Sequence, residues 1–272
     1  MKWPALASVA LVTALAMAAE SAPAQGSAPP DDRLIFGANG STLTGGSGGA
    51  GAAATWLHGP TAGTLIGAGA EYQTIANAHW TLGSVTGAMS LGTESGPRTN
   101  LSGELHEGAG AIAGRYFTYS LVIVGASRPL TGGLSLQLED RRIDIDRSHG
   151  NLPRIGFTYA WTPRFQSSLG YAHSVGGNLG TEIGTARIDF FGARTSFLAG
   201  AAGGKAAPAV LNLQTGIIGP GPTLKEVFVG FSRPYWRTNL QLVADYVKLA
   251  ATERITLSLT CTLPLRGRGV SI

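Results

Sequence analysis

The chain has 272 residues, of which 13% are charged, and its formal net charge of +4 comes mostly from arginine. Soluble domains carry about 25% charged residues, so this composition argues against an ordinary water-exposed surface. The single cysteine, Cys261, excludes an intramolecular disulfide framework. The basic residues are scattered and are not grouped with aromatic residues, so no nucleic-acid partner is expected.

The N-terminus has the form of a secretory signal peptide. Lys2 precedes an apolar run over residues 5–18, and Ala-x-Ala cleavage sequences follow, the last at residues 22–24. The run is shorter than the roughly 20 residues that an uncleaved membrane anchor needs. We expect a signal peptide over residues 1–24, cleaved after residue 24 or near residue 19, and a periplasmic leader over residues 25–32.

From Arg33 onward no helical period of 3.6 residues is evident. Short segments follow one another in which apolar and small polar residues alternate, each bounded by Gly, Pro, Asn or Asp. Fourteen strands are expected, or twelve if the glycine-rich first two do not form. The segments are 33–42, 51–58, 63–75, 79–91, 98–108, 114–127, 133–145, 153–162, 164–175, 185–198, 208–218, 223–232, 236–248 and 254–264.

The two faces of these segments differ as they do in membrane barrels. In "ITLSLTCTL", residues 255–263, every second residue is apolar and the residues between are Thr or Ser. Polar faces made mostly of small uncharged residues suit a barrel interior, and the apolar faces, with Cys261, are expected to contact lipid. The sequence therefore predicts an all-β fold, a single up-and-down antiparallel transmembrane β-barrel over residues 33–265, followed by a tail over residues 266–272.

Proline marks every second connection between the expected strands. The connections are "HGPTAG", "GTESGPR", "SRPLTGG", "TPR", "AGAAGGKAAP" and "SRPYW", whereas among the others only "GPGP" contains proline. Alternate turns of an up-and-down barrel lie at the same end, which we expect to face the periplasm because an exported chain with an even strand count has both ends there. An aromatic girdle is expected at this end, formed by Trp56, Tyr159, Trp161, Phe165, Tyr235 and Trp236.

In these features the chain resembles bacterial outer-membrane β-barrel proteins as a broad class. The resemblance covers the signal peptide and nearly all of the mature chain, and it rests on pattern, without a diagnostic motif. It implies a place in the outer membrane, insertion by the barrel-assembly machinery, and contact with outer-membrane lipid and lipopolysaccharide. The chain departs from the class at its C-terminus, where "PLRGRGVSI" contains no aromatic residue.

Charged residues on the expected inner faces point to a channel. Charges of both signs can line a water-filled pore, whereas the same residues joined in ion pairs would plug the barrel. Twelve to fourteen strands lie between the filled interior of about eight strands and the aqueous channel of 16 to 18. We expect a porin-like channel for passive passage of small hydrophilic solutes, or for export of a polymer such as exopolysaccharide with an export complex as partner. The expected lumen-lining residues are Glu71, Glu104, His106, Glu139, Arg141, Arg154, Arg187, Asp189 and Asp245.

Two alternatives remain open. One is a lipid-modifying hydrolase, which would need a Ser–His pair on the outer wall, with Ser148, His149 and His173 as candidates. The other is a barrel that does not conduct, with a structural or adhesive role, or a soluble β-sandwich. No cofactor or metal is expected, because the remaining histidines lack metal-ligand spacing. "GSGGAG", residues 46–51, matches the glycine spacing of a dinucleotide-binding motif, but no dinucleotide site is expected because the motif requires a helix after it and none is expected here.

Overall fold

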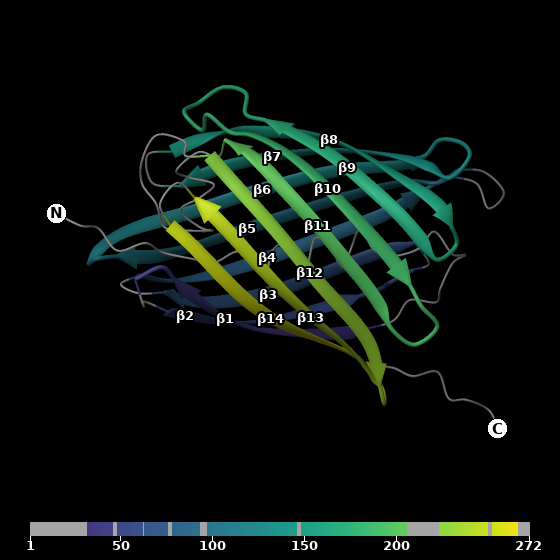
Figure 1. Cartoon of the computed structure of the whole chain (residues 1–272), viewed down its shortest axis with the longest axis horizontal. Coiled ribbons are helices and arrows are strands. Elements are labelled where there is room, and N and C mark those ends of the chain that lie inside the picture. Colours follow the sequence, from purple (N-terminus) through teal and green to yellow (C-terminus); the bar gives the residue numbers. More distant parts are fainter. Residues whose placement is uncertain are drawn as a thin grey trace.

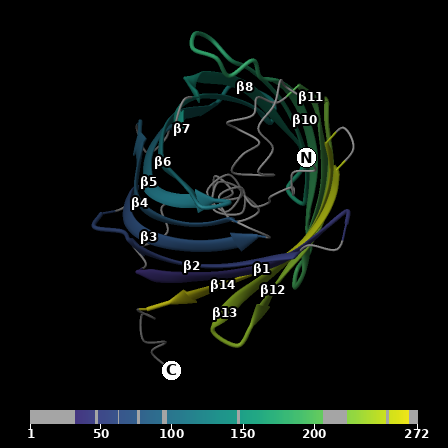
Figure 2. The same cartoon turned by 90° about the vertical axis from the view of Figure 1, so that its left-hand side faces the viewer.

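The computed structural model describes residues 32–45, 48–61, 63–75, 78–92, 97–145, 148–205, 223–249 and 252–265. They form a closed antiparallel barrel of fourteen strands in which neighbours in sequence are neighbours in the wall (Figures 1 and 2). This confirms the predicted fold class, while the expected signal peptide, leader and tail lie outside the described residues. The described part of the chain contains no helix that is both long and apolar enough to cross a membrane.

The strands vary in length from 9 to 15 residues. In chain order they are β1 (Arg33–Leu43), β2 (Gly48–His58), β3 (Thr64–Ile75), β4 (Ala78–Leu91), β5 (Thr99–Ile112), β6 (Arg115–Pro129), β7 (Leu134–Ile145), β8 (Ser148–Thr162), β9 (Phe165–His173), β10 (Glu182–Phe191), β11 (Ser196–Lys205), β12 (Thr223–Tyr235), β13 (Thr238–Leu249) and β14 (Thr252–Pro264).

The barrel closes where the first strand pairs with the last. The register runs from Arg33 opposite Pro264 to Leu43 opposite Arg254. At one end of this seam the Leu265 N–H donates to the Asp32 carbonyl at 2.7 Å, and at the other the Thr44 N–H donates to the Glu253 carbonyl at 2.9 Å. Closure leaves no open sheet edge, which a lipid environment requires because it offers backbone groups no other partner.

The two ends of the barrel differ in their connections. We call the end where β1 begins and β14 finishes the terminal end, at the right of Figure 1, and the other the opposite end. Among the described residues, one turn at the opposite end is only two residues long. Between β5 and β6, Ala113 (φ 50°) and Gly114 (φ 82°) both have positive φ, as the type I′ turn of a tight hairpin requires.

The predicted count of fourteen is right, but one of the predicted segments is wrong and another is not tested. The segment 185–198 was expected to be one strand, and it spans parts of β10 and β11, joined by a turn in which the Gly192 N–H donates to the Thr195 carbonyl at 3.0 Å. This turn has no proline and lies between Phe190 and Phe197, so the alternation gives no sign of it. The expected strand 208–218 lies outside the described residues.

The proline rule is correspondingly less regular than predicted. Pro60, Pro97 and Pro163 lie in connections at the terminal end, and Pro129 and Pro234 lie at the ends of β6 and β12 there. The connection between β10 and β11 is at the same end and contains no proline. "AGAAGGKAAP" begins inside β11 and leads toward the opposite end, so its assignment to the terminal end was wrong.

The outer wall is apolar over its middle and aromatic toward the terminal end. On β14, Ile255, Leu257 and Leu259 are exposed while Thr256 and Ser258 between them are buried. All six aromatic residues predicted for the girdle are exposed large side chains, and Phe190, Phe197 and Phe231 join them on the same part of the wall. Such a surface is stable only against lipid.

Replacing Leu257, which is 52% exposed in the middle of β14, with Arg is expected to lower the free energy of unfolding by about 2–4 kcal/mol, because the charge would lie in hydrocarbon. The matched control is Thr238→Arg at the start of β13. This position lies near the membrane interface, where an arginine lowers the free energy of unfolding by only about 0–1 kcal/mol. Urea unfolding of the vesicle-inserted protein, followed by tryptophan fluorescence, measures both. Equal losses would contradict a lipid-facing middle.

Candidate functional site

The structure places all nine residues expected in the lumen on the inward-facing side of the wall. On β10, Arg187 and Asp189 face inward, since the residues that alternate with them, Ile188 and Phe190, are exposed on the outside. His106, Asp189 and Asp245 are the most buried of the nine.

Ion pairs join six of the nine in twos along the strands. Glu104 Oε2 and His106 Nε2 are 3.0 Å apart on β5, and Glu139 contacts Arg141 on β7. On β10 the Arg187 Nε–H donates to Asp189 Oδ1 at 2.9 Å. Each of these pairs lies two residues apart on one strand, where side chains share a face. The charges are therefore held against the wall by near neighbours.

Two further charged residues belong to this inner surface and were not predicted. Arg254 Nη2 donates to Asp245 Oδ2 at 3.0 Å, and both side chains are less than 10% exposed. Glu226 faces inward from the neighbouring strand β12, where Phe228 is the register partner of Asp245. The alternation could have revealed both, because Glu226 precedes outward-facing Val227 and Arg254 precedes outward-facing Ile255.

The interior also contains a large cluster of buried apolar side chains, which the sequence did not predict. We call it the inner apolar cluster. It lies toward the opposite end and extends down β6, and Ile112 and Phe117 pack against it. The prediction of an interior made mostly of small uncharged polar residues was therefore wrong for this part. The cluster consists of Leu43, Ile75, Ala78, Trp80, Leu82, Tyr119, Leu121, Ile123, Ile143, Ile145, Leu152, Ala172 and Leu179.

Apolar and polar groups occupy successive positions on the same strands. On β7, Ile145 and Ile143 come first from the opposite end and Arg141 follows. On β3, Ile75 is followed by Gln73 and Glu71. Along these two strands the inward side chains therefore change from apolar to charged or amide with distance from the opposite end.

Glycines allow large inward side chains to lie along the wall. A Cβ on Gly200 would come within 2.3 Å of Phe228 Cζ, and one on Gly51 within 1.7 Å of Gln73 Oε1. The Gln73 amide, lying over Gly51, exchanges two hydrogen bonds with the Asn39 amide at 3.0 and 3.1 Å. These glycines give a physical reason for low-complexity sequence within regular strands, and β2 indeed begins at Gly48, so the twelve-strand fallback is not needed.

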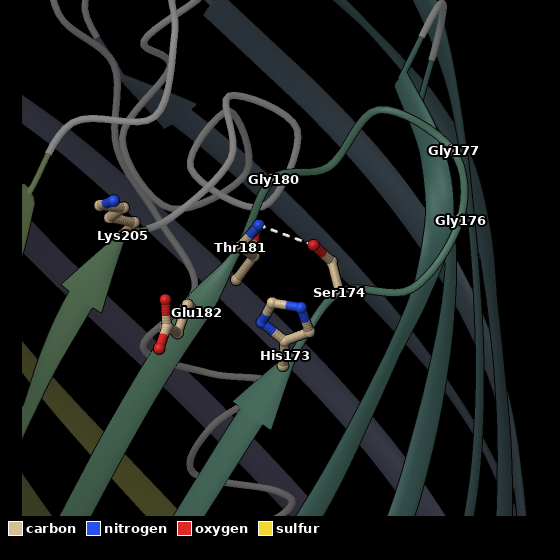
Figure 3. Close-up of a pocket in the computed structure, with 8 residues that line it drawn as sticks. All are labelled: His173, Ser174, Gly176, Gly177, Gly180, Thr181, Glu182 and Lys205. Atoms are coloured by element: carbon tan, nitrogen blue, oxygen red, sulfur yellow. Dashed lines mark hydrogen bonds between the residues drawn. The ribbon is translucent and has the colours of Figure 1, made fainter.

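The residues considered for a hydrolase do not form a catalytic pair. The expected strands placed Ser148 and His149 in a connection, whereas the structure places both in β8. As adjacent strand residues they face opposite sides of the wall. His173 lines a hollow of about 400 Å³ on the outer surface together with Ser174, Glu182 and Lys205 (Figure 3). Ser174 Oγ there accepts a hydrogen bond from the Thr181 backbone N–H at 2.8 Å.

No hydrogen bond joins a serine hydroxyl to a histidine ring among the described residues. The same part of the chain contains no group of three His, Cys, Asp or Glu residues placed to hold a metal ion.

Comparison with known proteins supports the fold. No family model matches the chain, and no curated protein matches it. The chain is similar to the monoaromatic hydrocarbon channel CymD (TM-score 0.61, 9% identity, 89% of this chain and 90% of that one). It is also similar to the toluene transporter TodX of Pseudomonas putida, with a TM-score of 0.52 and 9% identity over 86% of this chain and 89% of that one. For the KdgM porin the TM-score is 0.44 and the identity 10%, over 72% of this chain and 97% of that one. At this level of identity the likeness concerns the fold, a closed antiparallel β-barrel, as the sequence pattern predicts.

The substitution Arg254→Leu is expected to lower the free energy of unfolding by about 3–5 kcal/mol, because it leaves the buried Asp245 carboxylate without its cation. The double substitution Arg254→Leu/Asp245→Leu should recover most of this loss, since replacing a buried ion pair by apolar residues is often neutral. Urea titration of both variants and of Asp245→Leu completes a double-mutant cycle. Additive losses would show that the two side chains do not stabilise each other.

Proposed function

We propose that the protein is a passive outer-membrane channel and that it favours small solutes with an apolar surface. The observation that carries this proposal is the inner apolar cluster, which lies inside a barrel whose other inward residues include ion-paired, amide and hydroxylic groups.

The cluster affects water and solutes differently. An apolar lining holds water weakly and raises the barrier to ions by dewetting. A solute that replaces water there gains roughly 25 cal/mol for each Å² of apolar surface buried. Beyond the cluster, Arg141 and Glu71 can exchange hydrogen bonds with a polar group on the solute. This order favours a small molecule with a hydrocarbon body.

The names of the similar structures support the same substrate class. CymD is named as a monoaromatic hydrocarbon channel and TodX as a toluene transporter, and their TM-scores are 0.61 and 0.52. At 9% identity this likeness concerns the fold, so the argument for an apolar solute rests on the cluster itself.

The second candidate is the function expected from composition, passage of small hydrophilic solutes or export of a polymer. Its support is the inward set of ion-paired residues, in particular the Arg187–Asp189 pair on β10 and the Arg254–Asp245 pair between β14 and β13. These charges lie on the part of the wall outside the inner apolar cluster.

We propose further that the terminal end faces the periplasm. An exported chain reaches the outer membrane from that side, and an even number of strands places both ends of the barrel together. Insertion then involves the barrel-assembly machinery, and the opposite end meets lipopolysaccharide. Among the described residues the longest connection, 174–181, is at the opposite end, which agrees with the long outer loops of such barrels.

The test compares uptake of toluene and arabinose by cells that lack their own channels and express this protein. Leu121→Asn and Ile143→Asn should each lower toluene uptake by roughly threefold to tenfold, the equivalent of about 1 kcal/mol of lost apolar contact, and leave arabinose uptake unchanged. The matched control is Leu198→Asn, an inward apolar residue of β11 that is not in the cluster.

Uptake of arabinose without uptake of toluene, unaffected by the two cluster variants, would reject the apolar substrate and favour the second candidate. Uptake of neither solute, with the barrel present in the outer membrane, would favour a structural or adhesive role.

A further inference from the structure

The terminal end carries a ring of arginines that the channel function does not use. We call it the arginine collar, and each member lies in a connection at that end or within three residues of a strand terminus there. The acidic residues described at this end are Asp32, which pairs with His58, and inward-facing Asp189, which pairs with Arg187. The collar consists of Arg33, Arg98, Arg128, Arg164, Arg194, Arg233 and Arg237.

The charge at the opposite end is more mixed. By the same measure the described residues there include the acidic Asp144, Glu182 and Glu253, and Lys248 Nζ contacts Glu253 Oε1 at 2.8 Å while Arg254 pairs with Asp245. The basic residues at that end are Arg115, Arg142, Lys205, Lys225, Lys248 and Arg254. In contrast, none of the seven collar arginines has an ion-pair partner among the described residues. The collar is therefore a concentration of positive charge that the described protein does not neutralise.

The order of side chains beneath the collar matches the layers of a lipid leaflet. On the outside of β12, Arg233 at the rim is followed by Phe231 and then by Val229. In the β8–β9 hairpin, Arg164 in the turn is followed by Trp161 at the end of β8. Arginine, aromatic and aliphatic residues thus succeed one another in the order of phosphate, interface and acyl chain.

The distribution of the collar favours a planar partner over a single ligand. Its members lie at β1, before β5, at the end of β6, and in or beside the β8–β9, β10–β11 and β12–β13 turns, which are spread around the ring of strands (Figure 2). A discrete anion would need several of them to converge on one point. A sheet of headgroup phosphates surrounds the wall and can meet all of them.

We propose that the arginine collar holds the terminal end in the phosphate plane of the periplasmic leaflet by binding anionic phospholipid headgroups. A guanidinium group binds phosphate through two parallel hydrogen bonds and keeps its charge in all conditions. The choice of phospholipid over lipopolysaccharide rests on the orientation proposed above, and the proposal does not depend on whether the barrel conducts.

The experiment measures urea unfolding of the full chain in phosphatidylcholine vesicles with and without phosphatidylglycerol. Phosphatidylglycerol should raise the folding equilibrium constant of the wild type by roughly tenfold or more, since each basic residue near an anionic surface contributes about 1 kcal/mol before screening. The variant Arg164→Gln/Arg194→Gln/Arg233→Gln/Arg237→Gln should lose most of this gain. The matched variant Lys205→Gln/Lys225→Gln/Lys248→Gln at the opposite end should keep it.

Three outcomes would overturn the proposal. The first is a wild type insensitive to phosphatidylglycerol, and the second is an equal loss in the lysine variant. The third is a stabilisation that depends on the arginines but comes only from vesicles containing lipopolysaccharide, or equally from inorganic phosphate. If the arginine variant does not fold, the wild-type gain must still fall when salt is raised, because salt screens exposed charges.

Discussion

The hydrogen-bonded seam between β1 and β14 is the constraint on which the rest of the molecule depends. Without it the sheet would have two open edges, and hydrocarbon offers no partner for their backbone groups. With it, eleven register pairs from Arg33–Pro264 to Leu43–Arg254 complete the ring. Each residue in the wall then faces either lipid or the interior. The outer face can therefore be suited to lipid contact and the inner face to the lining of the channel, independently of each other.

The outer and inner faces do not differ in polarity in the same way along the whole wall. In the middle of the wall the outside is apolar and the inside is hydroxylic or charged, as on β14. Toward the opposite end this relation reverses on β7, where Asp144 and Arg142 face outward and Ile145 and Ile143 face inward. A barrel needs apolar residues outside only where lipid surrounds it, so beyond that level the interior can carry them instead. The inner apolar cluster and the arginine collar thus lie toward opposite ends of one wall.

The sequence allowed the closed barrel to be predicted because lipid imposes a strict period of two on strands such as β14. The same reasoning fails on β6, where "LVIV" places Leu121 and Ile123 inside and Val122 and Val124 outside. With both faces apolar, alternation cannot show that the interior there is apolar. Glu226 and Arg254 could have been predicted, since each alternates with outward residues, but the turn at 192–195 could not, since neither proline nor a break in the pattern marks it.

Single-channel recording in a planar lipid bilayer tests the central claim most directly, because it reports both the closed barrel and the nature of its lining. The account predicts discrete steps, smaller than those of a water-filled pore of the same strand number, that are reduced further when toluene is added and occupies the apolar lining. Silence after confirmed insertion would contradict a channel, and large steps indifferent to toluene would contradict an apolar pathway.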